Sequence, residues 1–346
     1  MNRVWASILP SMRLRLAPAG LLVVALVVVA AACTPFGRPP QNPPPGGGPP
    51  PGASTGDQNG PLNGCPVFPA NNPWNTDISN TTAYPPLTNS TAMVNQVLAD
   101  DSNQNLHADF GGGGAYGIPY VTVPGTEPAW PINYTEFGSE SDPGPFPIPL
   151  GAPVEGGSGS SGDRHVISVD RDNCRLYELY HGYPQQSSWN AGSGATWDLR
   201  SNAVRPAGWT SADAAGLPIF PGLARYDEVS AGAINHALRF TVNTTYRGYV
   251  YPARHCASTN TNPNEPAMGM RFRLKASYSL AGFHGQALVV LQALKKYGMI
   301  VADNGTSWYI TGAADARWDD NDLDQLKTVP GNQFDVVNTG AVTTCP

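Results

Sequence analysis

The sequence predicts a mainly β protein: one domain built as a β-sandwich of jelly-roll type, with two or three peripheral helices. Many short runs alternate polar and apolar residues with the period of a β-strand. Turn-forming residues separate these runs, since the chain has 38 Gly and 35 Pro among its 346 residues. The runs do not alternate regularly with helical patterns, which disfavours a parallel α/β fold. We therefore expect a single globular domain over residues 61–346.

The N-terminal residues 1–33 have the pattern of a signal peptide. Arginines precede an apolar run, Leu21–Ala30, that is too short to cross a bilayer comfortably. The small residues before Cys33 resemble a bacterial lipoprotein box, apart from Ala30, where that motif more often has Leu. The resemblance implies a lipid anchor on Cys33 that holds the exported protein at the outside of the cell membrane. Ordinary signal-peptidase cleavage, which would leave a secreted protein, is the alternative.

Residues 34–60 differ in composition from everything that follows. Pro and Gly dominate this segment, and it contains too few large apolar residues to form a core. We expect a disordered, partly extended tether between the membrane and the domain.

Charge and cysteine usage restrict the classes of partner. A formal net charge of −6 argues against nucleic acid. Besides Cys33, the chain has four cysteines, and an even number in an exported protein predicts disulfides with three possible pairings. They are Cys65, Cys174, Cys256 and Cys345. No pair has the Cys-x-x-Cys spacing of a zinc or thioredoxin site, and we expect neither metal nor cofactor.

In the first half of the domain, the sequence predicts one helix, one isolated strand and one hairpin. Met93, Val94 and Val97 make an apolar stripe in a helix over 90–100, which Ser90 or Thr91 can cap. The strand covers 120–123. The hairpin joins 164–169 to 174–180 through the polar turn 170–173.

In the second half of the domain, the sequence predicts more helices and strands. Two alternating runs, 236–242 and 270–275, are expected strands, and a helix over 283–297 ends at Gly298. The remaining expected elements are a hairpin of 299–302 with 308–311, a short acidic helix over 319–328, and a last strand over 334–337.

A cationic strand face is the first candidate for a binding site. Arg271 and Arg273 alternate with Phe272 and Leu274, so the arginines share one face of their strand. A guanidinium matches a carboxylate bidentately, and we therefore expect an anionic or polyhydroxylated ligand here.

Carboxylates near aromatic residues are the second candidate feature. Cleavage of a glycoside needs two carboxyl groups, one of them kept protonated, and we assign Glu178 and Asp213 to these catalytic roles. Glu178 lies on a rigid strand, whereas Asp213 follows Trp209 in a loop where burial can raise its pKa. His236 is the alternative base. The expected substrate-binding residues are Asp198, Arg200, Trp209, Arg239, Arg254, His255, Arg271 and Arg273.

Several segments together resemble a family of exported bacterial proteins that are mostly uncharacterised. The resemblance covers about residues 65–337 and rests on FPANNPWN (68–75), DRHV (163–166), CRLYELY (174–180), RPAGWTSADAAGLP (205–218) and KKYGMIVADNG (295–305). It implies one domain of a recurring kind and brings no established catalytic residues.

The expected function is cleavage of an extracellular polysaccharide or cell-wall glycan, as a glycoside hydrolase. The motifs of nucleotide-binding loops, serine hydrolases and zinc proteases are absent from the sequence, which disfavours those enzyme classes. Three alternatives stay open: a polysaccharide lyase acting on a uronate-containing glycan, a noncatalytic glycan-binding or wall-binding lipoprotein, and a structural surface protein.

Overall fold

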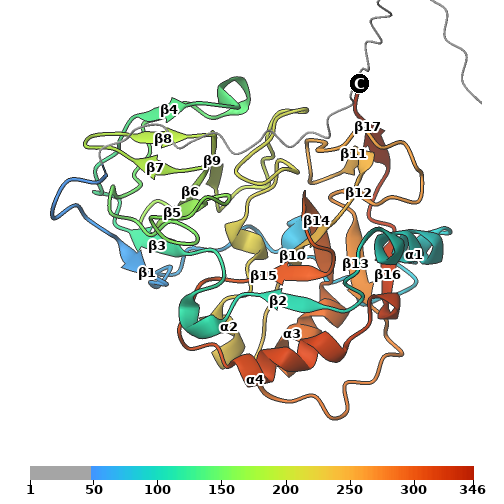
Figure 1. The fold of residues 1–346 in the computed structure, drawn as a ribbon. Coiled ribbons are helices and arrows are strands. Elements are labelled where there is room, and N and C mark those ends of the chain that lie inside the picture. Colours follow the sequence, from blue (N-terminus) through green and yellow to red (C-terminus); the bar gives the residue numbers. More distant parts are fainter. Residues whose placement is uncertain (1–47) are drawn as a thin grey trace, which may run out of the picture. The chain divides into compact units, whose positions relative to one another are not determined.

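The computed structural model describes residues 48–346, which belong to one compact unit (Figure 1). The expected signal peptide, Cys33 and residues 34–47 of the expected tether lie outside the described residues. Within the described part the chain is mainly β, as the sequence predicts. Its strands form four sheets, of five, six, three and three strands.

The five-stranded sheet contains the hairpin that the sequence predicts. The strand order is β1-β3-β5-β6-β9, with bounds Asp57–Gln58, Tyr120–Val123, Val166–Asp170, Arg175–Tyr180 and Ser193–Asp198. β5 and β6 pair antiparallel. Asp170 closes their turn, because its Oδ1 accepts hydrogen bonds from the backbone N–H groups of Asp172 and Asn173. Every residue of β5 is buried, so both faces of this sheet are covered near its centre.

The six-stranded sheet corrects one prediction. Its order is β16-β13-β14-β10-β15-β2, with bounds Phe334–Val337, Arg271–Leu274, Met299–Asn304, Leu238–Val242, Tyr309–Thr311 and His107–Asp109. The expected hairpin between residues 299–302 and 308–311 is wrong, because β10 lies between β14 and β15. Phe240 of β10 faces Val301 on one side and Ile310 on the other, and this buried apolar row selects the pairing.

Two three-stranded sheets complete the β structure. One has the order β12-β11-β17 (Ala267–Met268, Tyr246–Val250, Val342–Thr344) and the other β4-β8-β7 (Ile132–Tyr134, Trp189–Ala191, Tyr183–Pro184). The single jelly-roll sandwich is not confirmed, since the sheets are not closed. Jelly rolls are antiparallel, whereas the ladders β3·β5, β10·β14 and β2·β15 are parallel.

The helices follow the apolar periodicity of the sequence. α1 spans Ser90–Asp100, but neither Ser90 nor Thr91 caps it: Asn89 is the N-cap residue, and Ser90 Oγ accepts a hydrogen bond from the Val336 N–H of β16. α3 spans Gly285–Lys296, and Gly298, with φ of 68°, ends it. The acidic helix is α4, Asp320–Leu323, continued by the 3-10 helix η5, Asp324–Thr328. α2, Tyr226–Ser230, and five further 3-10 helices complete the described elements: η1 Pro73–Asn75, η2 Gly112–Gly114, η3 Gly138–Glu140, η4 Phe220–Gly222 and η6 Gly331–Gln333.

The expected tether overlaps the domain. Asp57 and Gln58 form β1 and pair with β3, and the Asn59 side chain donates to the Ala314 carbonyl and to Asp315. Residues 48–60 therefore belong to the domain, because this segment covers an otherwise open edge of the five-stranded sheet.

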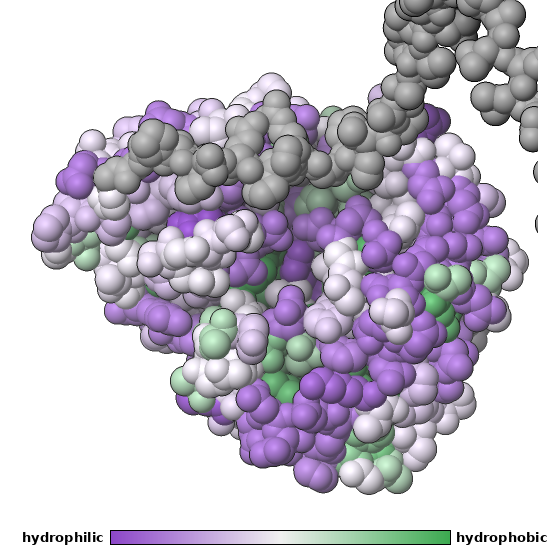
Figure 2. Space-filling model, viewed as in Figure 1, coloured by the Kyte–Doolittle hydropathy of each residue, from purple (hydrophilic) through white to green (hydrophobic). Residues whose placement is uncertain are grey.

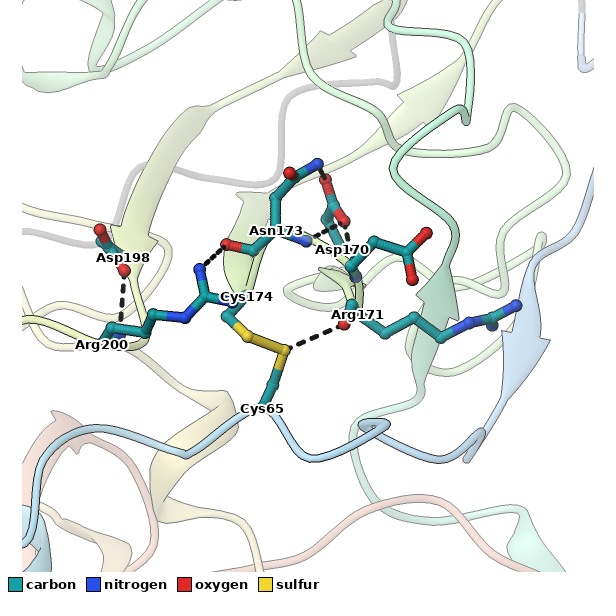
Figure 3. The surroundings of a disulfide bond; sticks show 8 residues. Cys65, Asp170, Arg171, Asn173, Cys174, Asp198 and Arg200 are labelled. Carbon is teal, nitrogen blue, oxygen red and sulfur yellow. Dashed lines mark hydrogen bonds between the residues drawn. A yellow bond between two sulfur atoms is a disulfide. The ribbon is translucent and has the colours of Figure 1, made fainter.

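Two disulfides join Cys65 to Cys174 and Cys256 to Cys345, which settles the pairing that the sequence left open. Figure 3 shows the first of them beside the β5–β6 turn, where it fastens the N-terminal segment to the hairpin. Two disulfides indicate an extracellular or otherwise oxidising environment. None of the helices within residues 48–346 is long and apolar enough to cross a membrane.

Candidate functional site

A polar cavity of about 230 Å³ lies between the six-stranded sheet and the loop that leads into β5. Figure 2 shows one face of the molecule, which is mostly hydrophilic and hollowed near its centre. Four carboxylic acids, one histidine and one arginine are among the lining residues: Asp109, Glu155, Asp163, Asp303, His165 and Arg239. Thr241, Tyr309 and Thr311 also line it. Such a concentration of ionisable groups in one concavity is the usual mark of a functional site.

An irregularity in the sheet brings Asp303 into the cavity wall. On β10, Arg239 pairs with Ile300 of β14, but Thr241 pairs with Asp303, so one residue of β14 is left without a partner. That extra residue, Ala302, turns Asp303 to the face that carries Arg239 and Thr241. The Ala302 carbonyl accepts a hydrogen bond of 3.0 Å from the Ala215 N–H, which fixes the bulge against a neighbouring loop.

Arg239 forms the floor of the cavity and is held by a buried carboxylate. Its Nε and one terminal nitrogen donate to the two oxygens of Asp213 at 2.9 and 2.7 Å, while the other terminal nitrogen donates to Thr311 Oγ1 at 2.6 Å. Burial acts to lower the pKa of Arg239, but the Asp213 charge and hydrogen bonds raise it. The Asp303 carboxylate stays 3.9 Å from the guanidinium. Arg239 therefore forms a two-point ion pair with Asp213 and makes no hydrogen bond with Asp303.

Glu155 and His165 form the opposite wall. His165 Nδ1 lies 2.7 Å from Glu155 Oε2, and His165 Nε2 lies 3.0 Å from the Ala212 carbonyl. Burial would lower the pKa of His165, but the Glu155 carboxylate raises it to about 9. In turn, burial would raise the pKa of Glu155, and the His165 charge and hydrogen bonds bring it below the ordinary value. The pair is therefore an imidazolium and a carboxylate at neutral pH.

The carboxyl groups of Asp303 and Asp109 have raised pKa values, in contrast to that of Glu155. Burial, followed by the charge of Asp213, raises the pKa of Asp303 to about 7. Burial in the cavity wall also raises the pKa of Asp109, although water reaches its side chain. The cavity thus combines a carboxyl group whose pKa is raised to about 7 with one whose pKa is lowered, which is the arrangement used for acid–base chemistry.

The carboxyl pair predicted from the sequence does not meet in this cavity. Glu178 is fully buried, and its oxygens accept hydrogen bonds from the backbone N–H groups of Ile219 and Phe220 at 2.8 to 3.0 Å. Burial raises the pKa of Glu178 to about 7 against the effect of these donors. Asp213 is also fully buried and binds Arg239. The face that Glu178 shares with Leu176 belongs to the core, since both side chains are fully buried.

His236 and the two arginines of the cationic face are likewise internal. His236 lies 3.1 Å from Glu228 and 3.3 Å from Arg225 in a buried cluster beside α2. Arg271 donates to the carbonyls of Tyr297, Pro73 and Thr76. Arg273 donates to those of Ile78 and Tyr84. The face expected to bind an anion therefore holds the 73–84 segment on the sheet.

The remaining predicted residues are dispersed. Arg254 donates to the Arg205 carbonyl, and His255 Nδ1 lies 2.8 Å from the Ala214 carbonyl. Trp209 packs under the Arg205 guanidinium. Asp198 and Arg200 lie at the Cys65–Cys174 disulfide, where Arg200 donates to the Asn173 carbonyl (Figure 3). Of the expected site residues that the structure describes, only Arg239 lines the cavity.

Sequence reasoning missed five of the six ionisable cavity residues. Asp163, His165 and Asp303 lie in segments that carry the family resemblance, and Asp303 directly follows the expected strand over 299–302. The signal that could have found these residues is the concentration of Asp and His at the ends of expected strands, where side chains leave the core. Asp109 and Glu155 gave no local signal, because both lie in stretches without regular periodicity.

No family model, curated protein or solved structure matches the chain. Within residues 48–346, no group of three or more His, Cys, Asp and Glu side chains has the arrangement of a metal site.

Proposed function

We propose that the protein is a glycoside hydrolase that cleaves an extracellular polysaccharide or cell-wall glycan. One observation carries the proposal: the cavity places Asp303, whose pKa is raised to about 7, with Glu155, whose pKa is lowered. Glycoside hydrolysis requires this division, because one carboxyl group must donate a proton to the leaving oxygen while another acts as an ionised base or nucleophile.

Asp303 is the proposed general acid, because it holds a proton close to neutral pH and lies on a strand fixed by the Ala302 bulge. Glu155 is the proposed base or nucleophile. Its Oε2 contacts both His165 Nδ1 and the His165 N–H. Its Oε1 accepts no hydrogen bond from a described residue, so this oxygen is available to a water molecule or to the sugar.

The rest of the lining suits a sugar ring. Asp109, Asp163 and Thr241 offer oxygen atoms to hydroxyl groups. Tyr309 stacks on His107 with ring centroids 4.8 Å apart, which presents a fixed aromatic ring beside the cavity. Ligand pockets usually measure about 300–1,000 Å³, so a cavity of about 230 Å³ suits one ring of a chain rather than several.

The charge of the lining favours a neutral or cationic sugar. Carboxyl groups outnumber cationic groups, and Arg239 is already neutralised by Asp213. A polysaccharide lyase needs a free cation against the uronate carboxylate. The arginines expected to provide it, Arg271 and Arg273, bind backbone carbonyls instead. We therefore rank hydrolysis above elimination.

Depolymerisation assays on neutral, amino-sugar and uronate glycans test the proposal. We expect new reducing ends from a neutral or amino-sugar glycan, without the absorbance of an unsaturated product. An unsaturated product would indicate the lyase. Binding without cleavage, with the protein folded, would leave the noncatalytic glycan-binding protein.

The same proposal includes export and anchoring through a lipidated Cys33. The two disulfides support export, since they form in oxidising compartments. Mass analysis of the mature N-terminus is the test: a diacylglyceryl-modified cysteine is expected, and an unmodified N-terminus beyond residue 33 would leave a secreted protein.

A further inference from the structure

A hydrogen-bonded row of three side chains lies outside the cavity, next to the end of β6. His181 directly follows β6, Tyr183 begins β7, and Glu136 lies in the loop that follows β4. β4 and β7 both pair with β8 (Figure 1). His181 Nδ1 lies 2.7 Å from Glu136 Oε1, and His181 Nε2 lies 2.9 Å from the Tyr183 hydroxyl oxygen. None of these three residues lines the cavity.

The contacts determine the direction of both hydrogen bonds. A carboxylate only accepts hydrogen bonds, so His181 donates to Glu136 through Nδ1. The other nitrogen of a neutral imidazole is then an acceptor, and the Tyr183 hydroxyl donates to it. A hydroxyl group, a base and an orienting carboxylate in this order are the arrangement that activates a nucleophile.

The backbone of His181 supports a functional role for the row. Its φ of 54° lies in the left-handed region, which is unfavourable for residues other than glycine, and its N–H donates to the Asp163 carbonyl at 2.8 Å. The side chains of His181 and Glu136 are 18% and 21% exposed. Water can reach these side chains, so burial alone does not require them to pair. Backbone strain of this kind is concentrated at active sites, where it orients reactive groups.

Arg164 places a positive charge beside the tyrosine. Its guanidinium carbon lies 4.2 Å from the centre of the Tyr183 ring. Nε donates to the Gly182 carbonyl, and Nη1 donates to those of Ser158 and Ser160, which fixes the side chain. Nη2 donates to no acceptor within residues 48–346, so it is available to a bound group. A cationic donor fixed beside a nucleophile can stabilise the oxyanion that forms during acyl transfer.

We propose that Tyr183 is the nucleophile of a second active site, which hydrolyses acyl esters independently of the glycan-cleaving site proposed for the cavity. The Tyr183 oxygen attacks the ester carbonyl carbon, and its proton passes to His181 Nε2 while Glu136 stabilises the imidazolium. His181 then gives this proton to the leaving alcohol, which leaves the acyl group on Tyr183. A water molecule, deprotonated by His181, attacks the acyl-tyrosine and releases the acid, and the phenol regains its proton. Phe137, 41% exposed and next to Glu136, offers an apolar surface to the ester.

Reaction of the full chain with p-nitrophenyl acetate tests the site. We expect repeated turnover with release of p-nitrophenolate, and an acetyl group on Tyr183 in peptides from an acid-quenched reaction. Tyr183→Phe should reduce the release to the uncatalysed rate, because it removes the attacking oxygen and retains the ring. His181→Asn should slow acetylation by about 10²- to 10⁴-fold, since asparagine tolerates a positive φ but cannot take up the proton.

Tyr116→Phe is the matched control. Tyr116 is 65% exposed and lies in another loop, between β2 and β3, so it represents an accessible tyrosine outside the row. This variant should hydrolyse p-nitrophenyl acetate as fast as the wild type. The unfolding temperature of each variant shows whether it is folded, and Tyr183→Phe should keep the wild-type value because it removes a single half-buried hydroxyl group.

Acetylation of Tyr116 as fast as that of Tyr183 in the wild-type chain would overturn the proposal, because accessibility alone would then explain the reaction. Turnover by the wild type no faster than by Tyr183→Phe would also overturn it. So would unchanged acetylation in a folded His181→Asn variant, since Tyr183 would not depend on its base. None of these outcomes involves glycan cleavage, so the ester-hydrolysing site and the glycoside hydrolase can fail separately.

Discussion

Charged side chains are concentrated both in the cavity and in the core around β6 and β13, but their hydrogen-bond partners differ. In the core, Glu178 and Arg271 each bind several backbone groups. In the cavity, Asp303 and Glu155 contact neighbouring ionisable groups and keep oxygen atoms available. A charged group whose hydrogen-bonding capacity is taken up by the backbone holds the fold together, whereas a carboxyl group that keeps an oxygen atom available beside other ionisable groups can exchange a proton or bind a substrate.

The strongest test of this comparison is Asp303→Asn. If Asp303 is the general acid, the variant should lose about 10²- to 10⁴-fold in kcat/KM on the glycan identified by the depolymerisation assays. Its unfolding temperature should stay near the wild-type value, since the substitution removes repulsion with Asp213. Full activity in the folded variant would remove Asp303 from the mechanism.

Arg271→Met tests the core, where we expect the reverse of the Asp303→Asn result: stability falls and activity is retained. It leaves the carbonyls of Tyr297, Pro73 and Thr76 without their donor, and each buried group without a partner costs about 1–3 kcal/mol. Denaturant unfolding should show a loss of at least about 2 kcal/mol. The fraction that remains folded should retain its glycan-cleaving activity. A selective loss of substrate affinity would instead restore Arg271 as a binding residue.

The pH dependence of stability reports on both regions near pH 7 and on the cavity, through His165, at alkaline pH. Glu178 and Asp303 have pKa values raised from 4.5 and 3.8 to about 7, so the stability they contribute is lost as pH rises through about 7. His165, raised from 6.5 to about 9, contributes stability that is lost between these values. The unfolding temperature should therefore fall from about pH 5 to pH 9. His165→Gln should flatten the alkaline part of this curve, and an unaltered curve would show that His165 does not stay protonated.

Glu178→Gln should have the smallest effect on activity. The retained carbonyl can still accept from the Ile219 and Phe220 N–H groups, so we expect a loss of about 1 kcal/mol in stability and kcat/KM within about twofold of the wild type. A large fall in kcat at unchanged stability would return Glu178 to the catalytic role that the sequence first suggested.

Periodicity predicted most of the secondary structure but little of the site. α1, α3, β10, β13 and the β5–β6 hairpin follow from apolar spacing, which is a local property of the chain. The cavity depends on which strands become neighbours, and a parallel pair such as β10 and β14 leaves no local signal. Sequence also cannot distinguish an arginine that faces solvent from one that caps buried carbonyls, so Arg271 and Arg273 were interpreted as a binding surface.

The bulge on β14 makes the position of the proposed acid depend on how β14 pairs with β10. In a regular ladder the side chain of Asp303 would share a face with the buried side chains of Met299 and Val301. Because Ala302 is left unpaired, Asp303 lies opposite Thr241 instead, on the face of Arg239. Deleting Ala302 would keep Asp303 on that face, since alternation would then pass from Val301 directly to Asp303. A change of pairing that absorbed the bulge without removing a residue would turn the carboxyl into the apolar layer, with no catalytic residue substituted.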